Sequence, residues 1–168
     1  KAKPPSGSGN YFNPGDYLVT LIANRHFESR VGGHPTFVIE STIDRVLLKL
    51  DHVLDAEGKT VSKASNPEGV QASQVFQPTK HPYPDIPLGE LRQYAAALLG
   101  VPFDEVTGEM VEKAFEDDGA AFAGLPLKVH VHDKPKKTGG GMVTIVRYSQ
   151  PSAGELALLG ASEGIPLE

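Results

Sequence analysis

Residues 124–149, GLPLKVHVHDKPKKTGGGMVTIVRYS, form two alternating runs joined by a loop with lysines and three consecutive glycines. The first run alternates apolar and polar side chains with the period of two that half-buried strands show. Its apolar positions are Leu125, Leu127, Val129 and Val131, and its polar positions are Lys128, His130 and His132. The pattern predicts a β-hairpin with one face in the core, one cationic face and a basic, flexible tip. Such a tip suits an anionic polymer, although a solvated loop is the simpler interpretation.

The length and composition predict one domain with tails. The chain has 168 residues, which is enough for one sizeable core and too short for two. It has no cysteine, so disulfides, thiolate metal sites and cysteine nucleophiles are excluded. No apolar run approaches the roughly 20 residues of a membrane-spanning helix, and the charged start does not resemble a signal peptide. We therefore expect an intracellular protein that does not enter a membrane.

Three zones follow from the distribution of Pro, Gly and Ser and of strand and helix patterns. Residues 1–14 are expected to be a flexible arm, residues 15–149 a compact domain, and residues 150–168 a tail with a short helix near 155–159.

The net charge of −5 is unevenly distributed. Residues 104–118 contain seven acidic residues and one basic residue, whereas residues 119–150 contain five basic residues and one acidic residue. Since phosphate binding depends on the potential over one face rather than on the sum, the hairpin is predicted to be the basic pole of the domain. The acidic segment is most simply a solvated helix face.

The order of elements is predicted to be β, β, an irregular crossing, α, α, β, β. Residues 17–26 and 37–50 have strand composition, and a run as long as 37–50 implies two strands or one strongly bent strand. Residues 60–87 contain five prolines and leave room for one short strand near 70–76. Helices are expected over 88–99, ending at Gly100, and after an N-cap at Thr107. This order predicts a mainly β fold with inserted helices, a five-stranded barrel of the oligonucleotide-binding (OB) type, with an α+β sandwich as the alternative.

Several motifs together resemble a known family. They are the segment 14–19 (PGDYLV), Gly33 followed by 37–40 (FVIE), Gly69 with Ser73, the helix 91–100, the acidic helix opened by Thr107, the segment 124–129 (GLPLKV), and 137–139 (KTG) with 143–148. This combination is similar to small bacteriophage proteins of replication and recombination modules that resemble single-stranded DNA-binding OB-fold proteins. The resemblance implies sequence-independent binding and protection of single-stranded DNA, which would lie across the barrel and under the last hairpin. It also implies action in the cytoplasm of the infected bacterial host.

The candidate DNA-binding residues are basic side chains of the strands and the hairpin, together with one aromatic ring. They are Lys128, His130, His132, Lys134, Lys136, Lys137, Arg147, Tyr148, Arg25, Arg30 and Arg45. Lysines and arginines would contact phosphates, and Tyr148, beside Arg147, is the preferred stacking ring. The chain has no Trp and only 7% aromatic residues, so few bases could be stacked. Packing of Tyr148 in the core and plain surface roles for single arginines remain alternatives.

The sequence gives little support for an enzymatic or metal-binding function. The pair His130 and His132, followed by Asp133, has a spacing compatible with a metal, but no third ligand is evident. No nucleophile elbow, phosphate-binding loop or zinc-protease motif is present, so we expect no enzyme, no metal and no cofactor. The competing hypothesis is a protein-interaction module, accessory to replication or virion assembly, that uses the acidic helix or the tail. Replication or recombination proteins would be its partners, and homo-oligomers are left open.

Overall fold

The structure is a computed structural model that describes residues 11–29, 32–135 and 142–162. Some predictions fall outside these ranges. They concern residues 1–10 of the arm, Arg30, Lys136, Lys137, and residues 163–168 of the tail.

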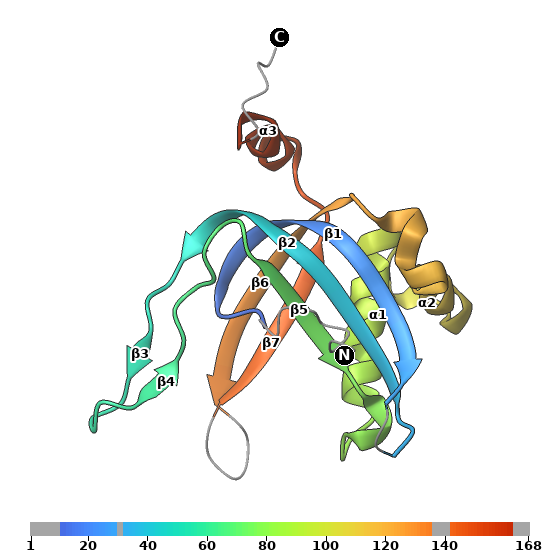
Figure 1. The fold of residues 1–168 in the computed structure, drawn as a ribbon, viewed down its shortest axis with the longest axis horizontal. Helices are drawn as coiled ribbons and strands as arrows, with labels where there is room; N and C mark the ends of the chain where they lie inside the picture. Colours follow the sequence, from blue (N-terminus) through green and yellow to red (C-terminus); the bar gives the residue numbers. More distant parts are fainter. Residues whose placement is uncertain (1–10, 30–31, 136–141, 163–168) are drawn as a thin grey trace, which may run out of the picture.

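Five antiparallel strands form the main sheet, in the order β5-β2-β1-β6-β7 (Figure 1). Their bounds are β1 Gly15–Glu28, β2 Pro35–Lys49, β5 Gln71–Phe76, β6 Pro126–Pro135 and β7 Met142–Ser149. The predicted mainly β fold with inserted helices is thus confirmed, and so are both hairpins, β1 with β2 and β6 with β7. The sheet is not closed into a barrel, because within the described residues β5 and β7 end it as two separate edges.

The first hairpin is unusually long and strongly bent. The pairing of β1 with β2 shifts register at three places, between Asp16 and Tyr17, Leu18 and Val19, and Leu21 and Ala23. Each shift adds a residue on one strand, which bends that strand and increases its twist. The run 37–50 is therefore one bent strand rather than two, and the curvature turns one side of the sheet into an enclosed surface.

A small hairpin projects from the main sheet between β2 and β5 (Figure 1). It consists of β3 Val53–Leu54 and β4 Thr60–Ser62, joined by a turn in which the N–H of Gly58 donates to the carbonyl of Asp55 at 3.0 Å. Residues 60–87 were predicted to be irregular apart from a short strand near 70–76, and this prediction is wrong for β4.

The helices lie between β5 and β6, apart from one at the C-terminal end. Their bounds are η1 Pro78–Lys80, α1 Asp85–Leu99, η2 Phe103–Glu105, α2 Gly108–Ala114, η3 Glu116–Phe122 and α3 Ala153–Ser162. α1 ends at Gly100, whose φ of 69° is left-handed, and the hydroxyl of Thr107 accepts a hydrogen bond from the backbone N–H of Met110 at the start of α2. Both boundaries were predicted. Among the described residues, no helix has the length and apolar character needed to cross a membrane.

The core lies between α1 and one face of the curved sheet, which we call the inner face. Leu91, Tyr94 and Leu98 of α1 pack there against alternate residues of the strands. The strand residues are Tyr17, Val19, Leu21, Ile39, Ile43, Leu127, Val129, Val131, Val146 and Tyr148. Leu125 was expected among them but is 40% exposed, because it precedes the first residue of β6.

Candidate nucleic-acid interface

The outer face of the sheet, opposite α1, carries most of the predicted basic residues of the strands. In the ladder, His130 lies opposite Asp16 of β1 on one side and Arg147 of β7 on the other. Two residues before His130 on β6, Lys128 lies opposite Leu18 of β1, and Leu18 lies opposite Arg45 of β2 on its other side. Because side chains alternate across a strand, His132 and Lys134 share this face with Lys128 and His130. These six positions, Arg45, Lys128, His130, His132, Lys134 and Arg147, are called the outer-face basic set.

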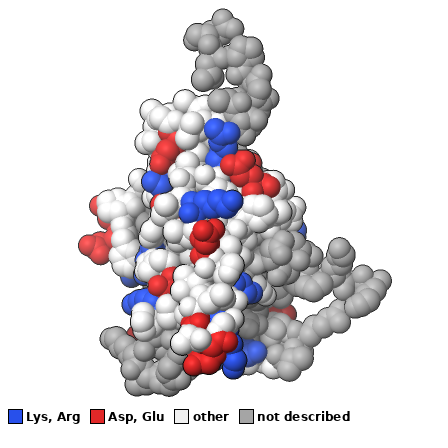
Figure 2. Space-filling view, turned by 90° about the vertical axis from the view of Figure 1, so that its left-hand side faces the viewer, with Lys and Arg blue, Asp and Glu red and all other residues white. Residues whose placement is uncertain are grey.

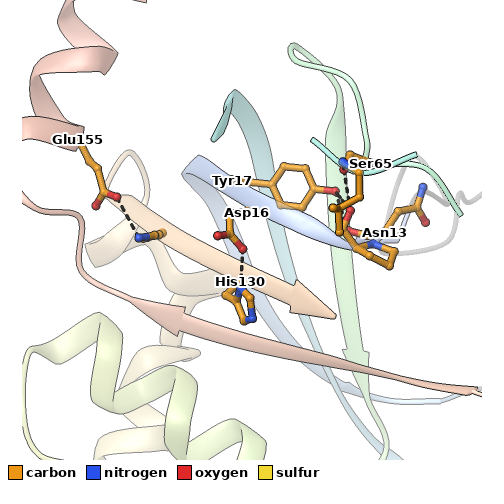
Figure 3. A network of polar contacts seen from close by, with 9 residues as sticks. Asn13, Asp16, Tyr17, Ser65, His130 and Glu155 are labelled. Atoms are coloured by element: carbon orange, nitrogen blue, oxygen red, sulfur yellow. Dashed lines mark hydrogen bonds and ion pairs between the residues drawn. The ribbon is translucent and has the colours of Figure 1, made fainter. Parts of the chain in front are cut away.

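Carboxylates accompany three members of this set. Lys128 Nζ lies 2.9 Å from Glu155 Oε2 of α3, and the His130 ring contacts the Asp16 carboxylate (Figure 3). Arg147 Nη1 lies 3.9 Å from Glu90 Oε2, at the distance limit of an ion pair. Within the described ranges, Arg45 and Lys134 have no carboxylate partner. The face is therefore a mixed-charge surface rather than a continuous cationic track.

The view of Figure 2 agrees with this mixture. On the side of the molecule that it displays, Lys and Arg side chains alternate with Asp and Glu side chains. Any polyanion bound at such a surface must displace carboxylates or bind between them.

Arg25 lies outside this set. It is seven positions along β1 from Leu18, roughly 23 Å at the usual rise of a strand. Its guanidinium contacts Glu40 Oε1 at 3.3 Å and Asp118 Oδ2 at 3.2 Å. These contacts tie η3 to the sheet, so its place in the fold is structural rather than part of the basic set.

Tyr148 lies on the inner face, and its predicted stacking role does not fit this position. The side chain is only 3% exposed, and its hydroxyl donates a hydrogen bond to Gln74 Oε1 at 2.7 Å. Its ring meets that of Tyr94 edge-on, with 4.8 Å between the centroids. Burial raises the pKa of Tyr148 well above its ordinary value. The ring is part of the core and cannot stack on a base in this conformation.

The base of the projecting hairpin is joined to the end of β6. Asp133 accepts hydrogen bonds from the Ser62 hydroxyl at 2.7 Å and from the Thr144 hydroxyl at 2.6 Å. The exposed Lys134 follows directly and leads toward Lys136 and Lys137, which lie outside the described residues. β3 and β4 thus start beside the basic end of the β6–β7 hairpin.

Within the part of the chain that the structure describes, the two histidines have no third potential metal ligand grouped with them. The rings of His130 and His132 lie 5.2 Å apart between centroids, but no cluster of three His, Cys, Asp or Glu suited to a metal occurs in the described part of the chain. The carboxylate of Asp133 is already engaged by Ser62 and Thr144.

Sequence reasoning missed the carboxylates of the outer face, Asp16 and Glu155. One signal for Glu155 was available. Ser152 and Glu155 have the spacing of a capping box, and the structure shows both of its hydrogen bonds, Ser152 N–H to Glu155 Oε1 at 2.9 Å and Glu155 N–H to Ser152 Oγ at 3.2 Å. These bonds and Lys128 lower the pKa of Glu155. That Glu155 then reaches Lys128 depends on how α3 packs.

Comparison with protein-family models gives no match to this chain, and comparison with curated proteins gives none either.

Proposed function

We propose that the protein binds single-stranded nucleic acid, DNA in particular, along the outer face and the adjoining β6–β7 hairpin, with little dependence on sequence. The observation that carries this proposal is the outer-face basic set: β2, β6 and β7 bring six predicted basic positions to one face of one curved sheet. Lysine and arginine side chains in such an arrangement can follow a flexible phosphate backbone without fixed geometry.

The carboxylates on this face reduce the attraction without abolishing it. Exposed ion pairs contribute only about 0–1 kcal/mol each, because water and salt screen them. A phosphate can therefore replace Glu155 beside Lys128, or the more distant Glu90 beside Arg147, at small cost. We expect binding of moderate affinity that falls steeply with salt.

We infer further that the sheet is an open version of the OB-type barrel. The support is its five strongly curved antiparallel strands, with helices inserted between β5 and β6. OB folds are themselves partly open barrels. Together with the resemblance of the sequence, this favours a protein that coats or protects single strands during phage replication or recombination, in the cytoplasm of the infected host.

A salt titration of binding to labelled oligo(dT), followed by fluorescence anisotropy, tests the proposal. Changing Lys134, Lys136 and Lys137 together to Ala should weaken binding and flatten the salt dependence by roughly one unit or less per lost phosphate contact. Lys113→Ala, on the exposed side of α2, is the matched control and should change neither. Absence of binding even at low salt would overturn the proposal, and equal affinity for duplex DNA would reduce it to general attraction by a basic surface.

A second candidate is the protein-interaction module. The observation in its favour is that α3 exposes Leu156 and Leu158 while its Glu155 holds it to the sheet. If oligo(dT) does not bind, and removal of residues 152–168 abolishes co-purification with a defined replication or recombination protein, this candidate replaces the first.

A further inference from the structure

The two edges of the open sheet approach each other without pairing. The hydroxyl of Tyr148 on β7 donates to the side chain of Gln74 on β5, which links the two strands from the inner side. Beside this link lies a pocket of about 440 Å³, which opens to solvent. Its volume is within the range of about 300–1,000 Å³ that small-molecule sites occupy. We call it the seam pocket; the residues that matter for its chemistry are Tyr11, Phe12, Gln74, Glu90, Thr144 and Val146.

The lining of the seam pocket includes Tyr11, an exposed aromatic residue on a fixed backbone. Tyr11 is 57% exposed, whereas Phe12 beside it is buried in the core. The backbone of Tyr11 forms a parallel bridge with Ser73 of β5, and its carbonyl accepts a hydrogen bond from Asn66 Nδ2 at 3.0 Å. The backbone of Tyr11 is thus fixed beside β5, and the exposed residue contributes to the lining of the pocket. A planar heterocycle can stack on such a ring, with a gain of about 1–3 kcal/mol typical of base–aromatic contacts.

Two polar side chains that line the seam pocket, Glu90 and Gln74, differ in hydrogen-bonding capacity. The carboxylate of Glu90 lies 3.9 Å from the guanidinium of Arg147, beyond hydrogen-bond distance. The oxygen of the Gln74 amide already accepts from Tyr148, which leaves its NH₂ group as the donor for the pocket. The pocket therefore offers two carboxylate oxygens and one amide donor.

Among the four DNA bases, only guanine has the complementary edge. Its N1–H and N2–H₂ are adjacent donors that match a carboxylate, and its O6 is an acceptor that matches an amide NH₂. Adenine, cytosine and thymine each present a single donor group on the same edge. We propose that the seam pocket seats one unstacked guanine of a bound single strand, with the base on Tyr11, its donor pair on Glu90 and its O6 on Gln74. This inference rests on the proposed function and adds a local base preference to it.

The path of the strand follows from Arg147. This residue lies on the outer face opposite His130, while its guanidinium reaches around the edge of β7 to the carbonyl of Val146 at 3.1 Å and toward Glu90. A strand on the outer face can therefore leave a phosphate at Arg147 and direct the adjacent base over the edge of β7 into the seam pocket.

The test uses short oligo(dT) strands that contain a single central dG, dA or deoxyinosine, in competition with labelled oligo(dT). Inosine keeps N1–H and O6 but lacks the N2 amino group. The dG strand should bind about tenfold more tightly than the inosine and dA strands, the effect of one good bidentate contact. Glu90→Gln should remove this preference, measured as the ratio of dG-strand to dA-strand affinity within the variant, and Glu109→Gln, an exposed acid of α2, should leave the ratio intact.

The outcomes separate the two proposals. If no strand binds, the proposed function is wrong. If all strands bind equally to the unaltered protein, the guanine site is wrong and the proposed function stands. An arginine-containing peptide also presents paired donors; binding of such a peptide that depends on Glu90, without a dG preference, would overturn the guanine site in favour of a peptide site. Thermal unfolding of Glu90→Gln, followed by circular dichroism, ensures that the variant is compared in its folded state.

Discussion

The side-chain amide of Gln93 pairs with the backbone of Tyr148 in the way that a neighbouring strand would. The N–H of Tyr148 donates to Gln93 Oε1 at 2.9 Å, and Gln93 Nε2 donates to the carbonyl of Tyr148 at 2.5 Å. Because backbone groups of an antiparallel strand alternate in direction, those of Tyr148 point away from β6, toward the free edge of β7. Gln93 of α1 thus covers part of an edge to which another chain could otherwise add.

Replacing Gln93 with Ala should destabilise the protein by about 2 kcal/mol. The change removes two hydrogen bonds and leaves the half-buried N–H and C=O of Tyr148 without these partners. Urea denaturation measured by circular dichroism gives the free energy of unfolding. Gln71→Ala is the control, because Gln71 is an exposed residue of β5 whose side chain makes no hydrogen bond within the described residues, and it should change stability little. Equal effects of the two substitutions would contradict a specific role for Gln93.

Gly119 of η3 lies against the sheet so closely that a side chain does not fit. A Cβ at this position would lie 2.8 Å from both the backbone nitrogen and the Cβ of Asn24, which is buried and hydrogen-bonded to Tyr94 and Ala114. Gly119→Ala should therefore cost about 2 kcal/mol more than Gly124→Ala in the free energy of unfolding. Gly124 is the matched control, because its φ is also positive, at 91°, but a Cβ there meets nothing within 4 Å. If both variants lost the same stability, backbone strain alone would account for the effect.

Local patterns predicted the parts of the fold that depend on neighbouring residues. Alternation placed Val129 and Val131 inside and Lys128 and His130 outside, as the structure shows. The same alternation, extended from the buried Val146, places Tyr148 on the inner face, in the core. The stacking role was assigned to Tyr148 because it lies next to Arg147 in the sequence, and the alternation of β7 contradicts that role.

Long-range packing could not be predicted in this way. Closure of a barrel depends on whether β5 and β7 pair, and these strands are far apart in sequence. The ion pair between Lys128 and Glu155 depends on where α3 packs, which no period in the sequence specifies. The seam pocket is lined by Tyr11, Gln74 and Glu90, which lie before β1, in β5 and in α1, so no local sequence motif predicts it.

Glu90 should make stability depend on pH in a direction opposite to that of most carboxylates. Burial is the main cause that raises its pKa above the ordinary value of 4.5, and Arg147 and His81 oppose the shift. The folded state therefore holds the proton of Glu90 more tightly than the unfolded state does. The resulting contribution to the free energy of unfolding is fully present below pH 4.5 and is lost as pH rises through the raised pKa.

Glu90→Gln removes this titration. The free energy of unfolding of the variant, relative to that of the unaltered protein, should increase as pH rises from about 4.5, so the variant gains relative stability. Denaturation series at several pH values measure the difference, and Glu109→Gln, which removes one exposed acid of α2, is measured in parallel as the control for the change in net charge. If the difference in the free energy of unfolding between Glu90→Gln and the unaltered protein did not change with pH, burial of the Glu90 carboxylate would not affect stability.

Glu155 competes with any phosphate for Lys128, and this competition can be measured. Glu155→Gln removes the charge next to Lys128 Nζ but keeps the capping box with Ser152, since Gln serves there as well as Glu. If the outer face binds single strands, the variant should bind oligo(dT) a few-fold more tightly than the unaltered protein at low salt, with a steeper salt dependence, because one more cation is available to a phosphate. Glu109→Gln changes the net charge equally but lies on α2, so it separates an effect local to Lys128 from an effect of total charge.

A gain of the same size in both variants would show that only the total charge matters. No gain in Glu155→Gln, with oligo(dT) still bound, would place the strand away from Lys128 and leave the β6–β7 hairpin and the edge of β7 as its path.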